Sequence, residues 1–248
     1  MRYQLYGEEV FEMEKRFNRI LLKVSGEALA GEKGTGFDEP TMESICMGIK
    51  AAYDEGVQIG VVVGGGNFWR GRSSGKMERT CADKIGMLAT VMNALALADC
   101  LQNVGVPAKV MTSVAMPQVA GVFTRDEAVA ALQAGQVVIF GGGTGCPFFS
   151  TDTAAVLRAA EIGADVILLA KNIDGVYDSD PAKNADAVKF DSITYDEVLK
   201  RHLAVMDSTA TSLSMDNHIP VLVFALKDPE NIIRALRGEK IGTIVKED

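Results

Sequence analysis

The sequence predicts an α/β fold with a mostly parallel sheet that helices cover on both faces. Short runs of β-branched and other apolar residues alternate with longer helical patterns from residue 19 to the end of the chain. The runs are almost continuously apolar, which is typical of parallel strands buried on both faces. Strand–helix alternation favours helical crossovers and a ligand site in the loops at the carboxyl ends of the strands.

The expected strands follow the apolar runs in chain order. They are Ile20–Val24, Gln58–Val63, Ala108–Thr112, Val137–Phe140, Val166–Leu169, Val221–Phe224 and Thr243–Val245. Residues 1–18 lie outside this pattern and are expected to form a polar extension, so that the domain spans residues 19–248.

Helix starts are readable between these strands. Thr124–Glu127 and Thr194–Glu197 have the spacing of capping boxes, and Asp228–Pro229 places a cap before a proline at the first helical position. Ser150 or Thr151 is expected to cap the helix after the fourth strand, because hydroxyl side chains are favoured at that position.

Composition and charge narrow the function classes. The 248 residues are 48% hydrophobic and 23% charged, an ordinary globular composition for one large domain or two small lobes. The net charge of −8 argues against non-specific binding to nucleic acid or to an anionic membrane. In the long helix expected over Asp83–Asn103, the apolar run Ile85–Ala98 has only 14 residues, too few to span a bilayer.

The cysteines and histidines point to a reducing compartment and away from metal chemistry. Four cysteines are scattered without a CxxC pair, which is typical of free thiols. With only two histidines, a histidine metal site or a histidine-based triad is not expected. The sequence therefore predicts a soluble cytoplasmic protein with no nucleic-acid partner, no membrane partner and no metal site of its own.

Four loops that follow expected strands carry the candidate chemistry. In the first, Lys23 can reach a phosphate, and Ser25–Gly26 let backbone N–H groups approach an anion. A surface lysine before a turn is the plainer alternative for this loop alone. The second, residues 64–71, has three glycines that allow close approach of backbone to ligand, and its Arg70 can contact a phosphoryl oxygen.

The third loop, Gly141–Asp152, combines a Gly-Thr-Gly run with a helix N-terminus, which attracts anions. Phe148 and Phe149 pack either on a base or on the core. Asp152 is either a helix cap or a carboxylate that orients a neighbouring lysine.

The fourth loop, residues 171–181, has two strong turn signals, Asp174–Gly175 and Asp180–Pro181. Turn formation alone explains both aspartates, whereas the planar ring of Tyr177 suits a wall for adenine.

Two common nucleotide-binding patterns are incomplete or missing. Gly66–Ser73 has the spacing of a Walker A loop, but an arginine replaces the lysine and nothing downstream supplies a Walker B. No GxGxxG fingerprint occurs, which argues against a dinucleotide-dependent oxidoreductase.

Taken in order, five stretches resemble the amino acid kinase superfamily and, within it, the bacterial branch that phosphorylates UMP. They are Arg19–Leu29, Gly64–Asn67, Gly86–Ala94, Gly143–Asp152 and Asp174–Tyr177. Each stretch is weak alone, but the set is specific and covers roughly residues 19–248. The resemblance implies a three-layer α/β/α sandwich around the sheet, with an acceptor-binding half at about 19–165 and an ATP-binding half at 166–248.

The resemblance also implies a role for individual residues. The residues that it implies for ATP binding are Lys23, Val24, Ser25, Gly26, Gly66, Arg70, Lys171, Asn172, Tyr177 and Asp180, the last four around the adenosine. UMP binding falls to Gly65, Asp83, Thr144, Gly145, Cys146, Pro147, Phe148, Phe149, Ser150 and Thr151. Catalysis falls to Lys23, Arg70, Asp152 and Asp207, and a GTP-linked segment to Gly31, Glu32, Lys33, Gly34, Thr35 and Gly36.

The implied reaction is transfer of the γ-phosphoryl group of ATP to UMP, with Mg²⁺ carried by ATP. The phosphate of UMP has a second pKa of about 6 and is largely dianionic at neutral pH, so its attacking oxygen needs no general base. Lys23 and Arg70 would neutralise charge on the transferring group, and Asp152 and Asp207 would hold these cations in place. The resemblance further implies activation by GTP, inhibition by UTP and a homohexamer.

Two other functions stay open at this point. One is a superfamily branch that phosphorylates a carboxylate or carbamate. The other is a nucleotide-binding storage or sensor protein without turnover, which should lack Lys23 or Arg70, although both are present.

Overall fold

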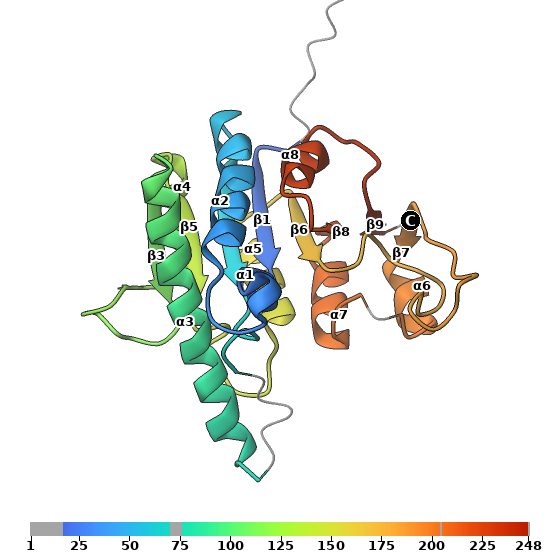
Figure 1. The fold of residues 1–248 in the computed structure, drawn as a ribbon, viewed down its shortest axis with the longest axis horizontal. Helices are drawn as coiled ribbons and strands as arrows, with labels where there is room; N and C mark the ends of the chain where they lie inside the picture. The colour runs from blue at the N-terminus through green and yellow to red at the C-terminus, as the bar shows by residue number, and fades with distance from the viewer. Residues whose placement is uncertain (1–16, 70–75, 204, 248) are drawn as a thin grey trace, which may run out of the picture.

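The computed structural model describes residues 17–69, 76–203 and 205–247, and these residues form one sheet of nine strands (Figure 1). The strands are β1 (Arg19–Val24), β2 (Gln58–Val63), β3 (Ala108–Thr112), β4 (Gly121–Val122), β5 (Val137–Gly141), β6 (Val166–Lys171), β7 (Ser192–Thr194), β8 (Val221–Ala225) and β9 (Thr243–Lys246). The expected polar extension lies almost entirely outside the described residues.

The helices alternate with these strands along the chain. They are α1 (Gly26–Leu29), α2 (Glu39–Asp54), α3 (Arg79–Asn103), α4 (Arg125–Gln133), α5 (Thr151–Ile162), α6 (Tyr195–Lys200), α7 (Ser208–Asp216) and α8 (Glu230–Leu236), with a 3₁₀ turn η1 (Gly31–Lys33) after α1.

The sheet is mostly parallel, as predicted. Its strand order is β4-β3-β5-β2-β1-β6-β8-β9-β7, and of the paired neighbours only β8 and β9 run antiparallel. All the expected strands are present, and β6 continues beyond its expected end at Leu169 to Lys171. The two strands that were not expected, β4 and β7, are two and three residues long and form the edges of the sheet.

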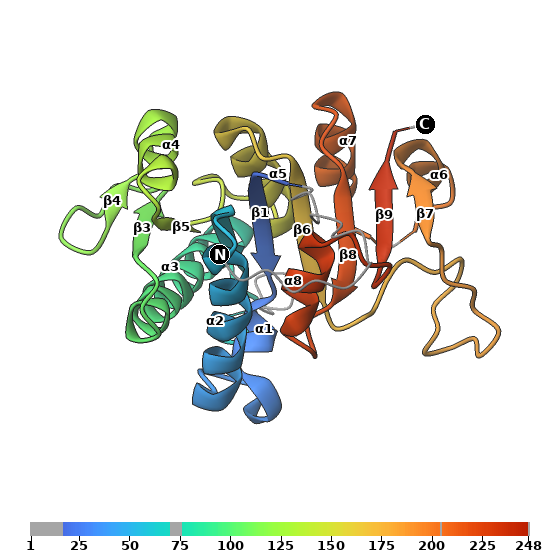
Figure 2. The same cartoon turned by 90° about the horizontal axis from the view of Figure 1, so that it is seen from above.

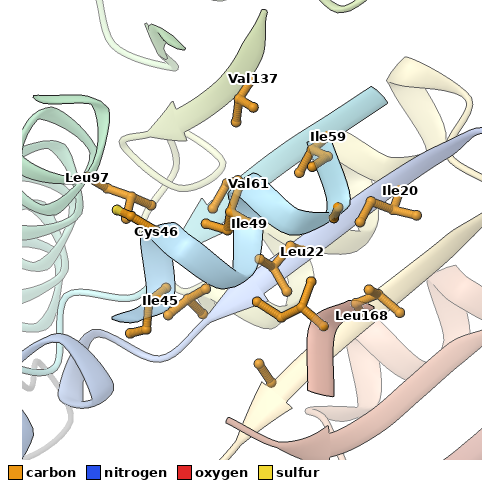
Figure 3. Close-up of a cluster of buried hydrophobic side chains, with 14 of the residues drawn as sticks. Ile20, Leu22, Ile45, Cys46, Ile49, Ile59, Val61, Leu97, Val137 and Leu168 are labelled. Atoms are coloured by element: carbon orange, nitrogen blue, oxygen red, sulfur yellow. The ribbon is translucent and has the colours of Figure 1, made fainter. Parts of the chain in front are cut away.

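Helices cover both faces of the sheet, which confirms the three-layer α/β/α arrangement. Figure 2 shows α2, α3 and α8 on one side, and α4, α5 and α7 on the other. Alternate residues of β1 enter the two cores: Ile20, Leu22 and Val24 pack with the first, and Leu21 packs with the second. Figure 3 shows part of the first core, where side chains of β1, β2, β5 and β6 lie against α2 and α3.

Hydroxyl caps begin several helices where the sequence predicts them. Ser150 accepts hydrogen bonds from the backbone N–H groups of Asp152 and Thr153, at 3.0 and 3.1 Å, which makes Ser150 the cap of α5. Thr124 and Thr194 likewise cap α4 and α6. The N-termini of these helices are therefore fixed by local sequence.

Two helices begin elsewhere than expected. Helix α8 begins at Glu230, with Pro229 as the flanking residue, one position later than expected, although the side chain of Asp228 accepts from the N–H of Glu230 at 3.0 Å as a cap does. Helix α3 begins at Arg79, ahead of the expected start, because Glu78 caps it by accepting from the next N–H groups.

Helix α3 has 25 residues and, by length and composition alone, is long and apolar enough to cross a membrane. The expectation of no membrane span was based only on the 14-residue apolar run Ile85–Ala98 within it. The most apolar window of α3 is 44% buried inside the molecule, where the helix packs against β3 and β5. Because a core helix of a globular domain meets the same criterion, this is weak evidence for a membrane segment.

Candidate active site

The first and second loops meet at the carboxyl edge of the sheet, with their backbones in contact. The N–H of Gly64 donates to the carbonyl of Val24 at 2.9 Å. A Cβ atom on Gly26 would lie 2.4 Å from the carbonyl oxygen of Gly64, so only glycine fits there. Residues Lys23–Gly26 therefore sit directly beside the glycine loop.

Lys23 is buried, which excludes the plainer reading of a surface lysine. It is 8% exposed, and its ammonium lies 2.7 Å from the Oδ1 atom of Asp152. Asp152 is in the first turn of α5, whose N-terminus carries partial positive charge. The cap of α5 is Ser150, so Asp152 serves as the partner of a lysine rather than as the cap.

Asp207 joins two helix N-termini. It caps α7 by accepting from the N–H of Ala210 at 2.9 Å, and it also accepts hydrogen bonds from the hydroxyls of Ser150 and Thr153 at the start of α5. It thus accepts hydrogen bonds from hydroxyl and N–H groups, and it acts on Lys171 through its charge.

Lys171 lies in the same charged cluster. Its ammonium donates a hydrogen bond to the carbonyl of Val205. Burial lowers the pKa of Lys171, Asp152 raises it, the like charge of Lys23 lowers it and Asp207 raises it. The charges of Lys23, Asp152 and Asp207 therefore all act on Lys171, whereas Arg70, the other expected cation, lies outside the described residues.

A cavity of about 220 Å³ opens beside this cluster. Among the residues expected to bind UMP, those that line it are Gly65, Asp83, Thr144, Cys146, Phe149, Ser150 and Thr151. The expected ATP residue Gly66 lines it as well, whereas Gly145, Pro147 and Phe148 do not. The lining residues that were not expected are Trp69, Ala82, Gly86, Met87, Thr90 and Gly143.

Asp83 ties α3 to the third loop across this cavity. Its Oδ2 atom accepts from the backbone N–H of Phe148 at 2.9 Å and from the Nε atom of Arg79 at 2.7 Å. Phe148 has a φ of 72°, in the left-handed region, so this hydrogen bond holds a backbone conformation that is unfavourable for a side-chain-bearing residue. Phe148 and Phe149 are 64% and 53% exposed, which shows that they do not pack into the core.

Buried polar groups support the third loop from behind. The N–H of Gly142 donates to the hydroxyl of Thr90 at 2.8 Å, and the hydroxyl of Ser113 donates to the carbonyl of Gly143 at 2.6 Å. Arg158, which is 4% exposed, donates to Ser113 at 3.1 Å. Buried polar groups thus hold the backbone around Gly143 and Thr144, the two residues of the Gly-Thr-Gly run that line the cavity.

The segment Gly31–Gly36 is joined to the glycine loop through Asn67. The carbonyl of Asn67 accepts from the N–H of Gly36 at 3.1 Å and from the hydroxyl of Thr35 at 2.9 Å. The Nδ2 atom of Asn67 donates to the carbonyl of Gly36 at 2.8 Å and to Asn93 of α3 at 3.0 Å. Asn67 and Asn93 are 2% and 0% exposed. Because buried amides must find their hydrogen-bond partners within the protein, each side chain satisfies the other.

The residues expected around adenosine are divided. Tyr177 donates to Asp174 at 2.7 Å, and Asp180 pairs with Lys183 at 3.2 Å, both in the segment between β6 and β7. Asn172 lines a larger cavity of about 590 Å³ with residues of α1, α2 and the loop after β8. Lys171 alone of the four lies among the charged groups beside Lys23.

Comparisons with known proteins show the family to which this chain belongs. The model of the amino acid kinase family matches residues 18–229. The chain is 52% identical over 236 residues to a protein named uridylate kinase from Limosilactobacillus reuteri, covering 94% of this chain and 98% of that protein.

Two solved structures share the fold. The UMP kinase of Bacillus anthracis superposes with a TM-score of 0.91 at 38% identity, covering 94% of this chain and 97% of that one. The UMP kinase of Ureaplasma parvum gives 0.89 at 36% identity, covering 94% and 100%. The chain belongs to the amino acid kinase family and, within it, to the uridylate kinase branch.

Proposed function

We propose that the protein transfers the γ-phosphoryl group of ATP to UMP, giving ADP and UDP for pyrimidine nucleotide synthesis. The observation that carries the proposal is the N-terminus of α5. Ser150 and Thr151 line the 220 Å³ cavity, and the adjacent Asp152 holds Lys23. An acceptor phosphate in the cavity would therefore meet buried positive charge at its reacting end. The names of the relatives support the same assignment.

The proposed mechanism is positioning and charge neutralisation. The dianionic phosphate of UMP attacks without a general base, so the protein must hold two polyanions together. Lys23 would meet the charge that develops on the transferring group, and Asp152 would keep its ammonium in place. The N–H groups of the third loop would hold the acceptor phosphate.

Mg²⁺ is expected to enter with ATP, where it supplies positive charge to the phosphates. Among the described residues, no group of three or more His, Cys, Asp or Glu side chains is placed to hold a metal ion. Asp152 is paired with Lys23, and Asp207 accepts from hydroxyl and N–H groups. This donor set fits an ion held mainly by phosphate oxygens and water.

An acceptor screen tests the proposal. ADP release is measured with UMP, CMP, glutamate, aspartate and carbamate, and UMP should be strongly preferred over CMP. A site built to hydrogen-bond one base edge leaves buried groups unpaired with the other base. Equal kcat/KM for UMP and CMP would contradict the assignment, turnover of a carboxylate or carbamate would place the chain in another branch, and no turnover would favour a sensor.

We also propose control by nucleotides, with GTP as an activator and UTP as an inhibitor. The support is the hydrogen-bonded link from Gly31–Gly36 through Asn67 to the glycine loop, by which a change in one segment would reach the other. Steady-state rates are measured with each nucleotide up to millimolar concentration. An unchanged rate with both would remove the proposal.

A further inference from the structure

Strand β6 brings a second lysine to the edge of the sheet where Lys23 lies. In the β1–β6 ladder Lys23 is paired with Leu169, and Lys171 follows two residues later. Because side chains alternate along a strand, Lys171 is on the same face as Leu169, which packs in the second core under α5. Lys171 therefore stands about 6–7 Å farther toward the carboxyl edge than Lys23 does, on the neighbouring strand.

The groups around Lys171 leave part of its ammonium available. An ammonium has three donors, and among the described residues its hydrogen bond goes to the carbonyl of Val205. The nearby carboxylates are engaged, because Asp152 pairs with Lys23 and Asp207 accepts from the hydroxyl of Thr153 and the N–H of Ala210.

Around Lys171, the positive charge exceeds the negative charge of the Asp152 and Asp207 carboxylates. Two lysines and the N-termini of α5 and α7 converge there, and each helix N-terminus adds partial positive charge. Burial lowers the pKa of Lys171, and further negative charge nearby would favour its charged form. A polyphosphate would supply that charge, and perturbed lysines of this kind gather at functional sites.

We propose that Lys171 is a catalytic cation that contacts the phosphoryl group in transit between donor and acceptor, and does not contact adenosine. This inference rests on the proposed function and assigns to Lys171 a different part of the donor from that implied by the resemblance. Tyr177 and Asp180, the expected adenosine contacts, bond to Asp174 and Lys183 in the segment after β6. The ammonium of Lys171 is instead hydrogen-bonded to the carbonyl of Val205, where the charges of Lys23 and Asp152 act on it.

Two uncharged variants test the proposal by separating kcat from KM. Lys171→Met removes the charge and the donor, whereas Lys171→Gln keeps a donor for Val205 without the charge. A catalytic cation predicts that kcat falls about 10²–10³-fold in both variants, as for loss of one preorganised donor, with KM for ATP changed less than about threefold. A rise in KM for ATP with kcat retained would overturn the proposal and restore the adenosine contact. Near-normal kinetics in Lys171→Gln would show that only the hydrogen bond to Val205 matters.

A binding measurement gives a second readout. ADP, UMP and aluminium fluoride together mimic the transferring group, and calorimetry should show this complex weakened in both variants by the same factor as kcat, with binding of ADP alone little changed. Equal weakening of both complexes would overturn the proposal. Lys50→Met, which removes a surface lysine paired with Asp54 on α2, is the matched control and should change neither.

The acceptor screen on the unmodified protein tests the proposed function separately from this inference. If the protein phosphorylates another acceptor instead of UMP, the same variants are compared with that acceptor, and the same kcat criterion decides the role of Lys171. Melting temperatures are measured on each preparation, and Lys171→Gln decides if Lys171→Met does not fold.

Discussion

Lys23 is a charged group held almost entirely out of water. Its ammonium is compensated by the Asp152 carboxylate at 2.7 Å, and the side chain of Asp152 is itself only 18% exposed. Burying a charge is costly unless an opposite charge accompanies it, so each member of this pair needs the other. By the proposed mechanism, the stability of the fold and the phosphoryl transfer therefore depend on the same two side chains.

Lys23→Met should lower both kcat and the melting temperature. Loss of a charge that acts on the transition state should lower kcat about 10²–10³-fold, or roughly 2.7–4 kcal/mol. The melting temperature should fall because Asp152 is left without its counter-charge, at a cost up to the ~3–5 kcal/mol seen when a fully buried pair is broken. Steady-state kinetics and calorimetry on one preparation measure the two effects.

The double variant Lys23→Met/Asp152→Asn is the control for this prediction. Removing both charges should restore much of the melting temperature while kcat stays low. Full turnover in Lys23→Met would overturn the proposed mechanism.

Asp83→Asn should act on the acceptor alone. The variant retains an oxygen that can accept from the N–H of Phe148, so the third loop should keep its place. It loses the charge of a residue expected to bind UMP, where a carboxylate would accept hydrogen bonds from the ribose hydroxyls. Hydrogen bonds to charged groups contribute about 1.5–3 kcal/mol, so KM for UMP should rise accordingly with KM for ATP little altered. Asp99→Asn, on the exposed face of the same helix, is the control. A rise only in KM for ATP would place Asp83 in the other subsite.

At the scale of elements, the local pattern of apolar residues predicted the strands of the sheet except the two at its edges. The central strands were predictable because each is a continuous apolar run buried on both faces. Strands β4 and β7 were not, because Gly121–Val122 is exposed and Ser192–Thr194 is polar at its ends. Strands this short depend on pairing with a neighbour and have no periodicity of their own.

In the candidate site, too, some residues could be predicted from the local sequence and others could not. Loops after strands identified Lys23, Asp152 and most of the residues that line the cavity. The place of Lys171 could not be read from its loop, because it depends on the register between β6 and β1. The pair Asn67–Asn93 joins residues 26 positions apart, and nothing in the local sequence links them.

This amide pair should control the glycine loop. In Asn93→Ala, the carbonyl of Gly64 and the side chain of Asn67 lose their buried partner, and each orphaned group costs about 1–3 kcal/mol. Both the free energy of unfolding in urea and kcat should therefore fall. Asn103→Ala, at the exposed end of the same helix, loses only a bond to Asp99 and is the matched control. Equal losses in the two variants would show that Asn93 has no special role.

At the scale of the whole molecule, α3 contributes to the cavity and also presents an apolar outer face. Gly86, Met87 and Thr90 line the cavity, whereas Leu88 and Met92, one turn apart, are 55% and 45% exposed. Exposed apolar side chains that lie together mark interaction surfaces more often than isolated ones do. This face is therefore a candidate contact between copies of the chain in the homohexamer that the family resemblance implies.

Leu88→Glu should reduce self-association. A charge on this face would be buried against a second copy and would lack a partner there, which disfavours the interface. Analytical ultracentrifugation should show a smaller species at concentrations where the unmodified chain is assembled. The cavity is lined by the same helix, so KM for UMP should rise in parallel with dissociation. Val188→Glu, which alters a residue 61% exposed in the segment before β7, is the control and should change neither. An unchanged sedimentation coefficient in Leu88→Glu would show that another surface holds the copies together.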